Sequence, residues 1–124
     1  MKKRRKSELN KWEDKADRAL QDHWREKKLS CECCGSPAEI VHHYIEKHLS
    51  IGLRFEELNL IPLCQRCHTK HHLAGDMDIM DKVILKRGTK WLKKLHDLRL
   101  ERKEMKKSVE YYKQQFELWK SLTK

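Results

Sequence analysis

The sequence predicts an α+β protein that is mostly helical, with a small metal-braced core between an N-terminal helix and long C-terminal helices. Hydrophobic residues make up only 38% of the 124-residue chain and charged residues 39%, which is too little apolar matter for a large core. Two C-x-x-C pairs stand in the middle of the chain, and the flanks contain little Gly or Pro. We therefore expect a bound metal to stabilise the centre and exposed helices to form much of the rest.

The N-terminal helix is predicted over residues 8–29. Ser7 is a suitable N-cap for it. Side chains suited to the buried face then recur at the three- and four-residue spacing of a helix. They are Leu9, Trp12, Ala16, Ala19, Leu20, His23 and Trp24.

The centre of the chain is predicted to hold a short strand and a helix. Residues 30–44 carry turn residues and then the β-prone pair Ile40–Val41, which indicates a knuckle that leads into a strand. Residues 45–63 form a connection with a short helical turn near its end, in which Pro62 argues against a longer helix. From Gln65 the pattern is helical again until a glycine ends it.

The last third of the chain is predicted to be helical. Residues 77–87 form a first helix, and a long second helix starts near Thr89 with an apolar seam that Arg102 interrupts. The seam consists of Leu95, Leu98, Met105, Val109, Tyr112, Phe116 and Trp119. Packing of this seam on the first helix of the same chain is the default interpretation. The alternative is a homodimer or a partner protein bound through residues 95–119.

Three regions follow from this pattern: a basic N-terminal helix over residues 1–29, a zinc-braced core over 30–76 and a basic helical extension over 77–124. The net charge is +10, and all of the excess lies in the flanks. Residues 77–124 alone hold 14 Lys and Arg against 7 Asp and Glu. A small basic protein is expected to bind a polyanion with salt-dependent affinity, and a merely solubilising surface is the alternative.

The compartment is predicted from the cysteines and the N-terminal segment. No stretch approaches the roughly 20 apolar residues that span a bilayer. "MKKRRK" is followed by "SELNKWEDKA" without an apolar segment, which argues against a secretory signal. Five cysteines, four of them in tight pairs, suit metal binding in a reducing compartment. We therefore predict a cytoplasmic protein of phage or bacterial type without a membrane partner.

A structural zinc site is predicted from Cys31, Cys34, Cys64 and Cys67. Four thiolates around a tetrahedral Zn²⁺ would tie the strand segment to the helix that begins after the second pair. Cys33 is set aside because Cys31 and Cys34 repeat the spacing of the second pair and a glycine follows them. A redox C-x-x-C is the competing interpretation, which the presence of two matched pairs disfavours.

A second group of chemical residues remains, namely His42, His43, Asn59, His68 and His72. His68 and His72 stand four apart on one predicted helix and can share one metal ion or flank one phosphate. Adjacent histidines on a strand point to opposite sides, so one can bind metal while the other addresses a water molecule. Imidazole suits both roles because it is a metal ligand and titrates near neutral pH.

These residues resemble the HNH endonuclease motif of the ββα-metal (His-Me finger) fold, in the version with a four-cysteine zinc site. "VHHYI", Asn59–Leu60 and "LCQRCHTKH" match the motif in order, spacing and residue type over residues 31–72. The resemblance implies a His at the end of a strand, an Asn in the following loop and a third motif residue on a helix. A weaker similarity links the chain to phage recombination endonucleases of the NinG/Rap type, which typically have Gly-His at His42–His43 and Asn at His68.

The resemblance implies a metal-dependent endonuclease that hydrolyses DNA. His43 would be the general base that deprotonates water, and Asn59 would orient His43 or help the metal. His42 and His68 would hold the catalytic ion, with His72 as a third ligand or a phosphate contact. We expect Mg²⁺ or Mn²⁺ in this role, although imidazole ligands also suit Ni²⁺ or Zn²⁺.

Contacts to the DNA backbone are expected from basic side chains near and beyond the motif. The candidates are Arg54, Arg66, Lys86, Arg87 and Lys90. Two other functions remain open from the sequence. One is a non-catalytic zinc module that binds nucleic acid, and the other is a protein that recruits a partner through its C-terminal helix.

Overall fold

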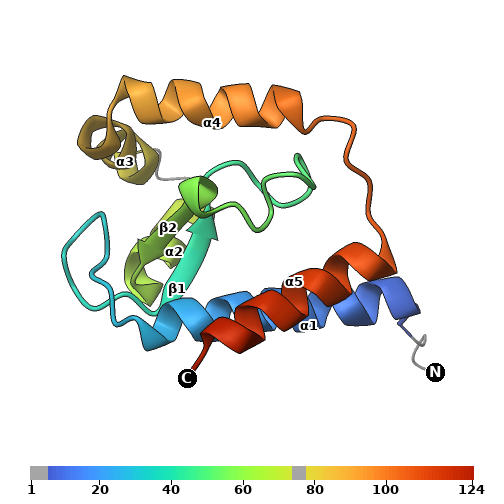
Figure 1. The fold of residues 1–124 in the computed structure, drawn as a ribbon. Coiled ribbons are helices and arrows are strands. Elements are labelled where there is room, and N and C mark those ends of the chain that lie inside the picture. The colour runs from blue at the N-terminus through green and yellow to red at the C-terminus, as the bar shows by residue number, and fades with distance from the viewer. Residues whose placement is uncertain (1–5, 74–77) are drawn as a thin grey trace.

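The computed structural model describes the backbone of residues 6–73 and 78–124, and the side chains of residues 6–71 and 79–124. The predicted fold class is confirmed, because the described chain is mostly helical with a small antiparallel sheet (Figure 1). In chain order the elements are α1 (Glu8–Glu26), β1 (Ile40–His43), the 3₁₀ turn η1 (Glu57–Asn59), β2 (Leu60–Leu63), α2 (Gln65–Leu73), α3 (Asp78–Arg87), α4 (Thr89–Glu101) and α5 (Val109–Leu122).

The hairpin of β1 and β2, followed directly by α2, forms the ββα unit at the centre of the molecule. The strands pair antiparallel, with His42 opposite Ile61 and His43 opposite Leu60. Because side chains alternate along a strand, Leu60 packs with α1 and α5 while Ile61 packs with α3. His42 and His43 are therefore directed to opposite faces of the hairpin, as their adjacency predicts.

Pro62 is compatible with β2 because the sheet has only two strands. It lies opposite Val41, and its carbonyl accepts a 3.0 Å hydrogen bond from the amide of Glu32 in the turn before β1. The residue pattern predicted the first strand but treated the second as part of a connection. Only the resemblance to a ββα unit implied this second strand.

Helix α1 starts where it was predicted and ends earlier. The Ser7 hydroxyl accepts a 3.1 Å hydrogen bond from the amide of Asn10, which is N-cap geometry. The helix was predicted to reach residue 29, but it ends at Glu26 because Lys28 adopts a left-handed backbone conformation with φ of 52°.

The long C-terminal helix predicted from Thr89 is wrong in one respect, because it is two helices. Helix α4 ends at Glu101, and the Ser108 hydroxyl caps α5 by accepting a 3.0 Å hydrogen bond from the amide of Tyr111. The chain turns back between them, so that α5 runs alongside α1 (Figure 1). Met105, which the seam placed on an apolar face, is in this connection and is 39% exposed.

Two larger apolar clusters sit on the two faces of the hairpin, and a smaller third one closes the long loop between the strands. The first joins α1 and α5 and contains Ala16, Leu20, Tyr112 and Trp119 together with Val41, Phe55 and Leu60. The second joins the cysteines, Ile61 and Leu63 to α3. The third holds Ile45 and Leu53 against Leu95 of α4. The C-terminal seam therefore packs within the chain, which was the default interpretation.

No helix among the described residues is both long enough and apolar enough to cross a membrane. Helices α3 and α4 lie on one side of the hairpin, and α1 and α5 lie on the other (Figure 1).

The cap at Ser108 distinguishes two helices from one continuous helix. We expect Ser108→Ala to lower the free energy of unfolding by about 0.5–2 kcal/mol, because the amide of Tyr111 loses its acceptor. In a continuous helix the same change would raise stability, since Ala is the better helix former. Urea unfolding followed by circular dichroism measures the sign. Ser121→Ala in the last turn of α5 is the control, with an expected change within about 0.5 kcal/mol.

Candidate functional site

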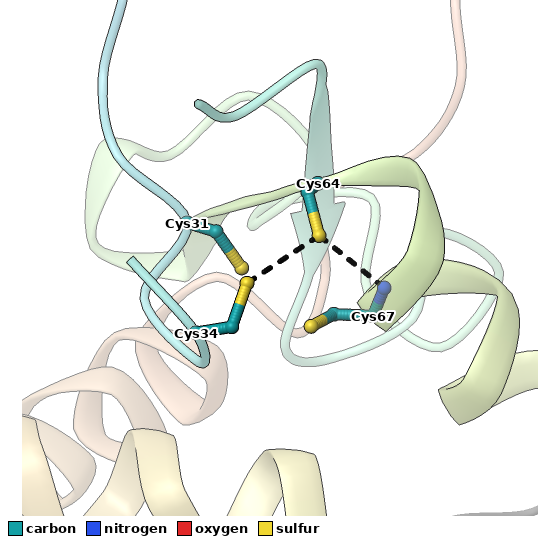
Figure 2. Close-up of side chains that lie close together, drawn as sticks. All are labelled: Cys31, Cys34, Cys64 and Cys67. Carbon is teal, nitrogen blue, oxygen red and sulfur yellow. Dashed lines mark hydrogen bonds between the residues drawn. The ribbon is translucent and has the colours of Figure 1, made fainter. Parts of the chain in front are cut away.

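Four cysteines come together between the turn before β1 and the start of α2 (Figure 2). The sulfur atoms of Cys31, Cys34, Cys64 and Cys67 all lie within 4.8 Å of one another. The Cys34 and Cys64 sulfurs are 3.6 Å apart. Zn–S bonds of about 2.3 Å in a tetrahedron place sulfurs about 3.8 Å apart, whereas a disulfide needs about 2.05 Å. The cluster thus has the geometry of a structural zinc site.

The local backbone of the two knuckles supports the same interpretation. Gly35 follows Cys34 with φ of 80°, a conformation that favours glycine, and the amide of Cys67 points at the Cys64 sulfur from 3.4 Å. The hydroxyl and backbone of Ser36 lower the pKa of Cys34 to about 6, whereas burial and the neighbouring thiols raise the pKa of Cys67, so the positions of the sulfurs and not their pKa values indicate the metal site. Cys33, set aside in the sequence analysis, is not among the four.

The cysteine cluster positions the helix that carries the histidines. Cys64 is the residue between β2 and α2, and Cys67 lies in the first turn of α2 directly before His68. The ion pair between Arg87 and Glu32 ties the first knuckle to the end of α3. Hydrogen bonds from Arg87 to the Leu58 and Leu60 carbonyls fasten the same point to the hairpin.

A pocket of 490 Å³ brings three of the predicted histidines together, namely His42, His43 and His68. It is lined by Gln21 of α1, by Ile40, Val41, His42 and His43 of β1, by Glu46, Lys47 and His48 of the following loop, and by His68 of α2. The rings of His42 and His68 have their centroids 5.5 Å apart. The three predicted residues His42, His43 and His68 therefore line one cavity together with His48, although the side chains of His42 and His43 start from opposite faces of the hairpin.

His43 is buried and held in one orientation. It is 5% exposed, and its Nε2 lies 2.7 Å from the carbonyl oxygen of Arg54. A carbonyl can only accept, so Nε2 carries the hydrogen and Nδ1 carries the lone pair. Burial lowers the pKa of His43 to about 4, so the ring is neutral at pH 7 with a nitrogen able to take a proton.

Asn59 is fully buried and holds the loop beneath His43. Its Oδ1 accepts from the Ile45 amide at 2.7 Å, and its Nδ2 donates to the carbonyls of Ile45 and Leu53 at 3.0 and 3.1 Å. These bonds occupy the amide with loop backbone. Asn59 therefore fixes the loop backbone as far as Leu53, the residue before Arg54, and its expected role at His43 or at the metal stays a prediction.

His71 is a residue of the site that the sequence reasoning missed. Its ring centroid lies 4.9 Å from that of His42, closer than that of His68. The sequence analysis did not include His71 among the chemical residues, yet residues three apart on a helix share a face, so its spacing from His68 was the available signal. His72, the predicted third ligand, lies within α2, but its side chain is outside the described residues.

The basic residues predicted to contact DNA divide into two groups. Arg66, Lys86 and Lys90 are exposed. The side chain of Arg54 is only 8% exposed and pairs with Asp17, and Arg87 pairs with Glu32. The expectation of DNA contacts does not fit Arg54 and Arg87, because their guanidinium groups bind carboxylates inside the protein.

A family model described as HNH endonuclease matches residues 31–73. The matched region contains both cysteine pairs, the hairpin and all of α2. Neither the curated proteins nor the solved structures contain a match to this chain. The resemblance to this family is confirmed, and that to the NinG/Rap-type endonucleases finds no support.

The cysteine cluster predicts a metal-dependent fold. We expect the purified protein to hold about one zinc ion per chain. Cys64→Ser should lose that ion together with the cooperative thermal transition, because metal binding energy is folding energy in so small a core. Elemental analysis and circular dichroism melting measure both properties.

Cys33→Ser is the matched control for this substitution, since Cys33 is adjacent in sequence to a cluster cysteine but outside the cluster. It should keep both the zinc and the transition. Loss of zinc in Cys33→Ser but not in Cys64→Ser would contradict the assignment.

Proposed function

We propose, from the membership of residues 31–73 in the HNH endonuclease family, that this protein is a metal-dependent endonuclease that hydrolyses DNA phosphodiester bonds. His43 is the general base in this proposal. The single observation that carries it is the state of His43: one ring nitrogen donates to a backbone carbonyl, and the ring lines the same cavity as His42 and His68.

The chemistry assigned to His43 is the activation of water. Nδ1 takes a proton from a water molecule, whose oxygen attacks the phosphorus while the bond to the 3′ oxygen breaks. The leaving 3′ oxygen takes up a proton from solvent, and Nδ1 releases its proton to solvent. The products would be a 5′ phosphate and a 3′ hydroxyl. A positioned general base contributes about 10²–10⁴-fold to such a rate. The bond from Nε2 to the Arg54 carbonyl keeps the ring in the tautomer that this step needs.

The neighbouring histidines form a donor set that suits a divalent ion. The ring centroids of His68 and His71 lie 5.5 and 4.9 Å from that of His42. His72 follows His71 on α2. Nitrogen donors favour Ni²⁺ or Zn²⁺, while Mg²⁺ and, less strictly, Mn²⁺ prefer oxygen. An ion held there would neutralise charge on the phosphate and assist the leaving oxygen.

Substrate contacts are assigned to residues at the rim of the cavity and on the exposed helices. Lys47 lines the cavity and pairs with Asp17 only at 3.8 Å, with its side chain 41% exposed, which still suits a contact to the scissile phosphate. Arg66 and Lys70 are exposed on α2, and Lys86 and Lys90 on α3 and α4. These side chains would contact phosphates and would carry little base information.

The proposal is tested by nicking of supercoiled plasmid in Mn²⁺. We expect His43→Ala to lower the single-turnover rate by about 10²–10⁴-fold, because the general base is lost. His96→Ala is the control, since His96 is exposed on α4 and is not among the residues that line the cavity. It should cut like the wild type, and both variants should bind plasmid in a gel-shift assay.

Two results would decide against this proposal. If the wild type and His43→Ala both bind DNA and neither nicks it across Mg²⁺, Mn²⁺, Ni²⁺ and Zn²⁺, the protein is a non-catalytic zinc module. If they nick equally, the activity belongs to a contaminant or to another site.

A further inference from the structure

We infer that Asp17 of α1 is a positioning residue for His43, an inference that rests on the proposed function. Asp17 lies outside residues 31–73, the region that the family model matches. Its carboxylate holds the side chain of Arg54, and the main-chain carbonyl of Arg54 accepts the hydrogen of His43 Nε2. The N-terminal helix would thus belong to the catalytic apparatus.

The contact between Asp17 and Arg54 is bidentate and largely buried. Arg54 Nε lies 2.9 Å from Asp17 Oδ1, and the terminal nitrogen lies 2.5 Å from Oδ2. The side chains are 18% and 8% exposed, and Glu13, one turn earlier on α1, adds a contact at 3.3 Å. Two parallel bonds of this kind fix both the distance and the orientation of the guanidinium.

Three independent contacts restrain the backbone that carries the Arg54 carbonyl. Asn59 holds the preceding carbonyl, that of Leu53, at 3.1 Å. Phe55 is buried on the other side, against the rings of Tyr111 and Tyr112. Asp17 holds Arg54, the residue between Leu53 and Phe55, by binding the Arg54 side chain. The peptide group that selects the tautomer of His43 is therefore fixed from α1, α5 and the loop itself.

The same helix also holds the strand on which His43 lies. The Gln21 side chain donates to the Val41 carbonyl and accepts from the Val41 amide, both at 3.0 Å. Gln21 follows Asp17 by four positions, so both side chains lie on one face of α1. One helix face thus contacts both the strand before His43 and the loop that accepts its hydrogen.

Stability alone does not account for a buried ion pair at this position. Apolar side chains of similar size often stabilise a protein as well as a buried pair does, because the pair must be desolvated. Apolar side chains at these two positions could not fix the orientation of residue 54 in the way that two parallel hydrogen bonds do. The geometry at His43 is the property that this pair controls.

The first variant is Asp17→Asn, which keeps the shape of the side chain and removes its charge. We expect kcat for plasmid nicking to fall by about 10–100-fold, the usual effect of removing a group that orients a catalytic ligand or base. KM for plasmid should change little, because Asp17 does not line the cavity and Lys47, which pairs with Asp17 at 3.8 Å, keeps its charge in this variant. The ring ¹⁵N signals of His43, read by NMR, should move from a pure Nε2–H tautomer towards a mixture.

A second variant separates positioning from folding, because Asp17→Asn leaves a buried guanidinium unpaired. In Asp17→Leu combined with Arg54→Met, the pair is replaced by apolar side chains, so Tm should recover. The main-chain carbonyl at position 54 is still present, but its anchor is gone. We expect kcat to stay low and the His43 signals to stay mixed. Asp22→Asn, at an exposed pair with Arg25 on the same helix, should match the wild type throughout.

A folded double variant with wild-type kcat and wild-type His43 signals would overturn the inference. A rise in KM with unchanged kcat would do the same, since it would make Asp17 a residue for binding substrate. The NMR readout does not depend on cleavage. If the wild type proves inert, the proposed function fails, while the His43 signals of the variants still decide whether Asp17 fixes the ring.

Discussion

Four cysteine sulfurs, brought within 4.8 Å of one another, join the turn before β1 to the first turn of α2. The rest of the centre depends on this contact. A chain in which charged residues slightly outnumber hydrophobic ones has few apolar side chains with which to hold a hairpin on a helix. Because His68 follows Cys67 directly, the cluster that stabilises the fold also places the helix beside His42. The cysteine cluster and the histidine pocket are separate sites, but the first positions the second.

The flanking helices do more than carry the positive charge of the chain. Helix α1 contacts β1 through Gln21, and it contacts the long loop through the pair of Asp17 with Arg54. Helix α5 packs along α1. The family match covers the ββα unit and not these helices. A ββα unit of this size leaves its loop backbone to be held by the surrounding elements. In this protein that role falls to a buried ion pair and to the aromatic rings of α5.

Much of the fold and part of the site could be predicted because the signals are local. The spacing of the cysteine pairs, the N-cap at Ser7 and the helical periodicity of α1 are all within reach of a few residues in sequence, and each is found in the structure. The break between α4 and α5 was missed because the apolar seam continues across it at helical spacing. Ser108 was the signal, but a serine caps a helix or sits within one according to its surroundings.

The sequence by itself determined which side chains are available to bind a metal and which residues can form helices, because spacing and periodicity are properties of the chain. The tertiary structure alone decided which charges are available to a substrate. Nothing in the sequence distinguishes Arg54 from Arg66. In the structure, Arg54 binds Asp17 of α1, 37 positions away in the chain, whereas Arg66 is exposed. Only folding brings such partners together. For the same reason the tautomer of His43 depends on a carbonyl that lies 11 positions away in the chain.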